Sequence, residues 1–128
     1  MAGPEQTVEQ LTLALNQGDL DAAVALYEEN AVLVGRPGQV ARGRSQIRQA
    51  LQDFVALHPT LTTTATQVTE SGDLALYMSR WSLRGTDPSG ASVTMGGEST
   101  DILRRQSDGR WLIALDNPWG VAVLSEAG

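Results

Sequence analysis

The sequence predicts an α+β domain in which helices come first and an antiparallel sheet follows. Up to Pro59, apolar residues recur at helical spacing. After Pro59 the pattern changes to runs rich in threonine and β-branched residues, separated by turns that contain glycine. Helices and strands that are segregated along a chain in this way typically pack with the helices on one face of the sheet.

Three helices are predicted before Pro59. The first covers residues 5–16 and the second covers residues 20–27, with a glycine and a capping aspartate between them. The third begins at Gly43 or Ser45. It ends before Pro59, because the residue that precedes a proline is pushed out of the helical region.

Four strands are predicted after the helices, joined by turns of the kind that glycine, aspartate and serine favour. They are expected over residues 60–69, 74–84, 91–106 and 110–117. A short buried run at residues 31–34 is the candidate for an additional first strand, and residues 35–38 have turn chemistry. The tail from Pro118 is expected to close over the sheet or to fray.

Composition limits the chemistry that the chain can perform. The 128 residues predict one domain over residues 1–128, and the net charge of −6 disfavours binding to nucleic acid or to an anionic membrane. Cysteine and lysine are absent and His58 is the single histidine, so thiolate, Schiff-base and two-histidine metal chemistry are excluded. No run is long enough to cross a membrane and no secretion signal is seen. We therefore expect a cytoplasmic protein without a cofactor.

Four segments resemble the nuclear transport factor 2-like superfamily, and in particular its ketosteroid isomerase and polyketide cyclase (SnoaL-like) branch. They are NQGDLD at residues 16–21, ALYEENA at 25–31, GRSQIR at 43–48 and LRRQSDGRW at 103–111. The resemblance implies a cone-shaped fold, with three N-terminal helices packed on a curved, mostly antiparallel sheet of four to five strands. It also implies an apolar pocket for a small hydrophobic molecule, and a homodimer that pairs the outer sheet faces.

The same resemblance indicates where catalytic groups would lie. Isomerases of this branch use a carboxylate base just after the short first strand, and two acidic hydrogen-bond donors. The base position falls on Gly35 and one donor position falls near Leu11, and neither residue can do this chemistry. Only the strand aspartate has a counterpart, Asp101. Steroid isomerisation is therefore disfavoured, and any catalysis is expected from the strands.

Asp101 is the first catalytic candidate. Ser99 shares its strand face, whereas Glu98 and Thr100 share the other face. A slip of one residue in the strand pairing would exchange the two faces, so Glu98 is kept in reserve for Asp101 and as a ligand-binding candidate. If Asp101 points into the pocket, desolvation would raise its pKa and suit it to acid–base work. The alternative is a surface carboxylate paired with an arginine.

The end of the last strand carries the second catalytic candidate, Asp116, followed by Asn117 and Trp119. These side chains could line the mouth of the pocket and orient a planar ligand. The alternative is a turn in which Asp116 or Asn117 caps backbone groups before Pro118.

Other side chains have both a binding and a structural interpretation. Tyr27 and Trp81 are candidates for the pocket wall, although aromatic residues on a half-buried sheet mostly serve the core or an interface. Four arginines gather around the start of the third helix, and they suit either an anion site or a solvated surface. They are Arg36, Arg42, Arg44 and Arg48.

Two functions of different kinds fit these observations. The first is a cofactor-independent isomerase, cyclase or dehydratase that performs acid–base chemistry on a carbonyl-containing metabolite. The second is a noncatalytic domain that binds a hydrophobic ligand or associates as a dimer. The absence of a polar residue at Gly35 favours the second, and a buried strand carboxylate would favour the first.

Overall fold

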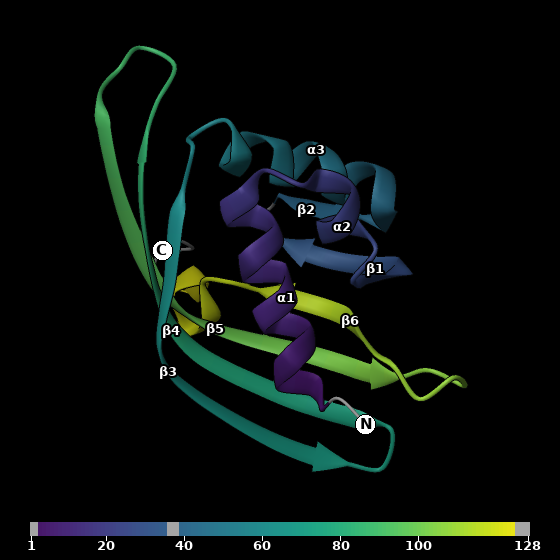
Figure 1. The fold of residues 1–128 in the computed structure, drawn as a ribbon. Coiled ribbons are helices and arrows are strands. Elements are labelled where there is room, and N and C mark those ends of the chain that lie inside the picture. Colours follow the sequence, from purple (N-terminus) through teal and green to yellow (C-terminus); the bar gives the residue numbers. More distant parts are fainter. Residues whose placement is uncertain (1–2, 36–38, 125–128) are drawn as a thin grey trace.

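The computed structural model describes residues 3–35 and 39–124 and consists of helices packed into the hollow of a curved sheet (Figure 1). Its elements in chain order are α1 (Pro4–Gln17), α2 (Leu20–Val24), β1 (Tyr27–Val34), β2 (Val40–Arg42), α3 (Gly43–Val55), β3 (Thr60–Ser71), β4 (Leu74–Thr86), β5 (Ser92–Arg105), β6 (Trp111–Asn117) and the 3₁₀ helix η1 (Gly120–Leu124). The predicted α+β class, with three helices followed by an antiparallel meander, is confirmed. Arg36 and the rest of residues 36–38, most of the turn predicted at residues 35–38, lie outside the described residues.

The sheet has six strands in the order β2-β1-β6-β5-β4-β3. All neighbours are antiparallel except β1 and β6, which run parallel. The predicted count of four to five strands is therefore wrong, because β2 adds a further strand. β2 is only 3 residues long, too short to show an alternating pattern, and it forms because its backbone pairs with β1.

The second helix is shorter than predicted. It ends at Val24, and Tyr27 is the first residue of β1 rather than the last residue of a helical stripe. The predicted Asp19 cap is present, since its carboxylate accepts a hydrogen bond of 3.1 Å from the Ala22 N–H. A helix this short gains little by itself. The chain instead joins the sheet, where the Ile113 N–H donates to the Leu26 carbonyl at 2.9 Å.

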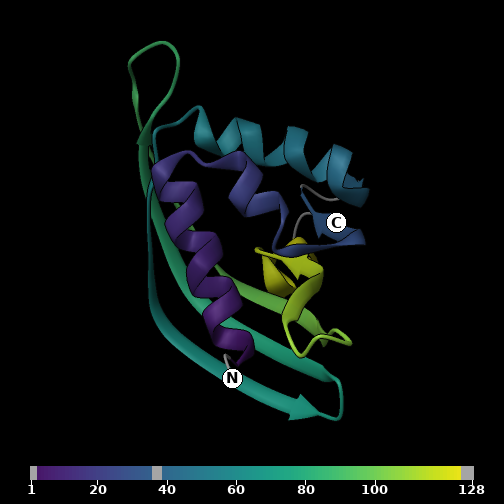
Figure 2. The same ribbon diagram turned by 45° about the vertical axis from the view of Figure 1, so that its right-hand side comes forward.

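The core lies between the helices and the concave face of the sheet. Figure 2 shows α1 running along the hollow that β3, β4 and β5 form, with α3 across its upper end. The apolar faces of both helices are buried against inward-facing strand residues such as Leu103 and Ile113, which are inaccessible to solvent. The Thr7 hydroxyl also donates to the Trp111 carbonyl at 2.7 Å, which attaches the start of α1 to β6. This packing places the start of β6 beneath α1.

Candidate active site

A cavity of about 90 Å³, partly open to solvent, lies between α1, α3 and the inner face of the sheet. Most of its wall is apolar and comes from both helices and from β3 and β4. The polar side chains gather mainly on the strands. They are Thr12, Tyr27, Thr63, Ser79, Ser99, Asp101 and Asp116.

Two carboxyl groups lie side by side in this wall. Asp101 on β5 and Asp116 on β6 are direct register partners, and side chains of directly opposed residues project from the same face of a sheet. Both are buried, with exposed fractions of 4% and 8%. Ser99 lies on the same inner face as Asp101. Glu98 instead points outward, where it pairs with Arg80 at 2.9 Å.

Each carboxyl group has a specific hydrogen-bond donor. The Tyr27 hydroxyl donates to Asp116 Oδ2 at 2.6 Å, across 89 residues of sequence. The Asn117 backbone N–H donates to Asp101 Oδ1 at 3.0 Å. A buried carboxylate needs such donors, because burying an uncompensated charge is costly. The arrangement therefore holds Tyr27, Asp116 and Asp101 in one network.

The two carboxyl groups differ in their affinity for a proton. Desolvation, the charge of Asp116 and a hydrogen bond with it raise the pKa of Asp101 well above its usual range. Desolvation also raises the pKa of Asp116, but hydrogen bonds from Asp101 and Tyr27 act in the opposite direction. Two adjacent buried carboxyl groups cannot both ionise at little cost, so they share one proton. The pair therefore takes up a proton more readily than an exposed carboxyl group does, and the hydrogen bond from Tyr27 favours the negative charge on Asp116.

Burial also keeps Tyr27 protonated. Desolvation is the main cause that raises the pKa of its hydroxyl, and the charge of Asp116 adds to it. Tyr27 thus acts as a hydrogen-bond donor, and the negative charge of the network stays on Asp116.

Replacing Asp101 by asparagine is expected to remove a pH dependence of stability. Because folding raises the pKa of Asp101, the stability that its proton contributes is present at low pH and is lost as the pH rises through the raised pKa. Asparagine keeps a donor there and does not titrate. We expect D101N to gain stability relative to the wild type as the pH rises above about 4, the usual pKa of an aspartate, measured by urea unfolding. Parallel curves for the two proteins would contradict the shared proton.

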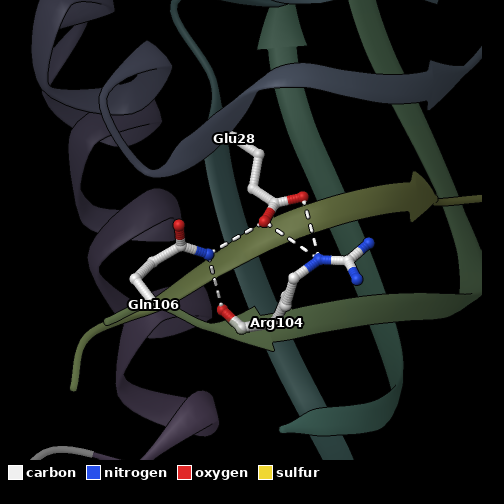
Figure 3. Close-up of polar contacts among 3 residues, drawn as sticks. All are labelled: Glu28, Arg104 and Gln106. Carbon is white, nitrogen blue, oxygen red and sulfur yellow. Dashed lines mark hydrogen bonds and ion pairs between the residues drawn. The ribbon is translucent and has the colours of Figure 1, made fainter. Parts of the chain in front are cut away.

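The backbone around Tyr27 is held from two sides. Arg44 at the start of α3 donates from Nε and Nη2 to the Tyr27 carbonyl, at 3.0 and 2.7 Å. The pairing of β1 with β6 shifts register just after Tyr27, and the guanidinium satisfies the carbonyl at this irregularity. Glu28 accepts from Arg104 Nε at 3.1 Å and from Gln106 Nε2 at 2.9 Å, across β6 (Figure 3).

The predicted arginine cluster is largely engaged within the protein. Arg44 holds the Tyr27 carbonyl, and Arg48 forms an ion pair with Asp21 on α2. Arg42 is exposed and Arg36 lies outside the described residues. The described residues therefore do not form the predicted anion site of four arginines.

The remaining predicted residues surround the end of β6. Trp81 lines the cavity and donates from Nε1 to the Pro118 carbonyl at 2.7 Å. Trp119 packs edge-on against Trp81, with ring centroids 5.3 Å apart. The Asn117 side chain bonds to the backbone N–H and carbonyl of Gly120 in its own turn, and it also donates from Nδ2 to Thr100 Oγ1 on β5 at 3.3 Å. Asn117 thus serves the turn, as the alternative interpretation proposed, and its backbone serves Asp101.

Of the two positions that the resemblance assigned to catalytic groups, only one lies in the cavity wall. Leu11 lines the cavity as an apolar residue. Gly35 follows the end of β1, where its N–H donates to the Gln39 carbonyl at 2.9 Å, and it does not belong to the cavity lining. Sequence reasoning missed Ser79 and the role of Arg44. The spacing of Ser79 between Tyr77 and Trp81, two inward aromatic residues, was the signal that could have identified it.

Comparisons with known proteins agree with this architecture. The family model of the SnoaL-like domain matches residues 8–113. No curated protein matches the chain significantly. Among the described residues, no helix has the length and apolar character that crossing a membrane requires.

Three solved structures illustrate the shared fold. A nuclear transport factor 2-like superfamily protein from Salmonella enterica is 15% identical with a TM-score of 0.79, covering 88% of this chain and 84% of that chain. A candidate ketosteroid isomerase from Shewanella frigidimarina is 24% identical with a TM-score of 0.77, covering 91% and 94%. The epoxide hydrolase/cyclase-like enzyme SalBIII, which acts in pyran ring formation in the polyether salinomycin, is 21% identical with a TM-score of 0.72, covering 91% and 88%. The chain therefore has the nuclear transport factor 2-like fold and belongs to the SnoaL-like domain family.

Proposed function

We propose that this protein is a cofactor-independent acid–base enzyme of the isomerase, cyclase or dehydratase kind, acting on a small carbonyl-containing metabolite. The observation that carries the proposal is the Asp101–Asp116 pair in the wall of an apolar cavity. Titratable groups whose environments separate their proton affinities are typical of active sites. The solved structures similar to this chain include isomerase and cyclase names, which is consistent with the same class of chemistry.

In the proposed reaction one carboxyl group acts as the acid and the other as the base. When the substrate enters, Asp101 redirects its hydrogen bond from Asp116 to the carbonyl oxygen of the substrate, or transfers the proton to that oxygen. Asp116, ionised and oriented by Tyr27, accepts a proton from the carbon next to that carbonyl. Return of the proton from Asp116 to another carbon atom completes an isomerisation. In a dehydration, a hydroxyl group two carbons from the carbonyl takes the proton from Asp116 and leaves as water, and any proton that Asp101 gave to the carbonyl oxygen returns to Asp101. A positioned acid and base of this kind contribute roughly 10²- to 10⁴-fold each.

The charge of the cavity restricts the substrate. No arginine or histidine belongs to the described residues that line the cavity, whereas two carboxyl groups do. A carboxylate or phosphate ester would be repelled in this environment, where charges are weakly screened. We therefore expect an uncharged substrate with an apolar body.

Exchange of carbon-bound protons tests the proposal without knowledge of the natural substrate. We expect the protein in D₂O to accelerate deuterium incorporation into the methyl group of acetophenone, followed by loss of its proton NMR signal. The expected rate is saturable in ketone and exceeds that of acetate at the same carboxylate concentration. Exchange no faster than with acetate would contradict proton abstraction and favour a binding function.

The outer face of the sheet supports the second candidate, association as a homodimer. Val32, Leu115, Ile102 and Leu76 are register partners in a row across β1, β6, β5 and β4. Leu76 and Leu115 expose 37% and 38% of their surface. An apolar row of this kind suits a two-fold contact between identical faces, and the Arg80–Glu98 and Arg104–Glu28 ion pairs supply charged side chains of both signs on the same strands.

A charge in the middle of this row is expected to separate the dimer. Sedimentation velocity at micromolar concentration should give a dimer for the wild type and a monomer for Leu115→Arg, because the contact would bury an unpaired guanidinium. Leu13→Arg on α1 is the matched control, since Leu13 is 57% exposed and away from the sheet. A monomeric wild type would exclude this interface.

A further inference from the structure

A second group of polar side chains lies in the cavity wall, apart from the carboxyl pair. The Oγ atoms of Ser79 on β4 and Ser99 on β5 are 2.6 Å apart, and both residues line the cavity. They are direct register partners, and Ser99 is 6% exposed. Serine has little reason to occupy the inner face of an otherwise apolar wall unless its hydroxyl has a partner.

The Ser79–Ser99 pair has one hydroxyl proton more than its mutual hydrogen bond uses. Two hydroxyl protons and one contact leave one proton over, whichever way the hydrogen bond is oriented. A polar atom in the cavity is a natural acceptor for it, and the remaining lone pairs can accept a donor.

The Ser79–Ser99 pair lies at a defined distance from Asp101 along the sheet. Ser99 and Asp101 are two residues apart on one face of β5, which corresponds to about 7 Å along a strand. The helices contribute a mostly apolar wall to the same cavity, with Leu11 and Leu15 from α1 and Phe54 from α3. A ligand that satisfies both ends therefore has an apolar middle.

We propose that the Ser79–Ser99 pair is a second polar subsite, which binds an oxygen of the substrate while Asp101 binds another. The substrate class is an uncharged, single-ring-sized molecule with a carbonyl oxygen at one end and a hydroxyl or second carbonyl oxygen at the other. This inference rests on the proposed function, because it assumes that the cavity is the substrate site. The size follows from the cavity, whose volume of about 90 Å³ is below the roughly 150 Å³ of an engineered cavity that holds benzene, so part of a ring would extend through the open side.

Two ring ketones that differ by one hydroxyl group test the subsite. The probes are 4-hydroxyacetophenone and acetophenone, and their dissociation constants are measured by NMR titration of the protein. We expect the wild type to prefer the hydroxylated probe by roughly threefold to tenfold, the range of one net hydrogen bond. The preference should disappear in Ser79→Ala/Ser99→Ala. Removing both partners of the Ser79–Ser99 hydrogen bond together leaves neither of these two hydroxyl groups unpaired, so this variant should fold.

Two further variants make the result specific. Ser82→Ala is the matched control, because Ser82 is exposed on β4, one residue out of phase with the inward-facing positions. It should keep the preference. Asp101→Asn should weaken the binding of both ketones by a similar factor, because an amide N–H is a weaker donor than a carboxyl O–H, and it should leave the preference for the hydroxyl group unchanged.

The outcomes separate the subsite from the proposed function. Binding of both probes without a preference, or a preference that survives loss of both serines, would overturn the subsite and leave the carboxyl pair intact. Failure of both probes to bind at millimolar concentration would overturn the cavity as a substrate site, and the subsite with it. A preference that disappears only with the two serines supports the proposal.

Discussion

Asp116→Asn is expected to lower the rate of acetophenone proton exchange by roughly two to four orders of magnitude. The base in the proposed chemistry is the ionised carboxylate, and an amide cannot accept the proton. Binding of the ketone should change far less, because the carbonyl oxygen is held by Asp101. A variant with unchanged exchange would exclude Asp116 as the base.

The Tyr27→Phe variant separates the chemical role of Asp116 from its surroundings. It removes the 2.6 Å hydrogen bond to Asp116 while it keeps the aromatic ring in the core. Without this donor the pKa of Asp116 should rise further, because the Tyr27 hydrogen bond is one of the influences that lower it. The rate profile for exchange should therefore shift to higher pH in Y27F, whereas D116N should lose exchange at every pH. Equal losses at all pH values in both variants would indicate that the fold of the site, and not the proton affinity of Asp116, controls the rate.

Much of the fold was predictable because its signals are local. The α1 helix, its end at Gly18 and the long strands β3 to β5 follow from residues within a few positions of one another, and these predictions are confirmed within a few residues. The resemblance to the nuclear transport factor 2-like superfamily depends on several such segments in order. The resemblance therefore still holds when the predicted bounds of one segment are wrong by a few residues.

The candidate site was only partly predictable, because its contacts are long-range. A period of two along residues 98–101 divides the side chains into two faces, but it does not say which face is inward. That choice depends on the pairing of β5 with β6. Likewise, residues 20–27 suit a helix locally, and only the pairing of β1 with β6 places Tyr27 beside Asp116. No local pattern contains a contact between residues so far apart.

Gly120→Ala is expected to be strongly destabilising and to disturb the site indirectly. Gly120 has φ of +54°, and a Cβ there would lie 2.3 Å from the Glu98 carbonyl oxygen. The left-handed conformation costs about 1–2 kcal/mol for other residues, and the overlap with a backbone atom adds about 1–3 kcal/mol. We expect urea unfolding to show a loss of about 2–5 kcal/mol, the sum of these two contributions.

Gly72→Ala is the matched control, because it isolates the conformational part of this cost. Gly72 has φ of +59°, but a Cβ added there would meet nothing within 4 Å, so only the left-handed penalty of about 1–2 kcal/mol remains. G120A should also slow ketone exchange, since the turn at Gly120 is bonded to Asn117, whose N–H holds Asp101. G72A should leave exchange unchanged. Equal losses of stability in G120A and G72A would show that the backbone at Gly120 accommodates a Cβ without strain. Normal exchange in G120A would show that Asp101 keeps its orientation when the turn at Gly120 is disturbed.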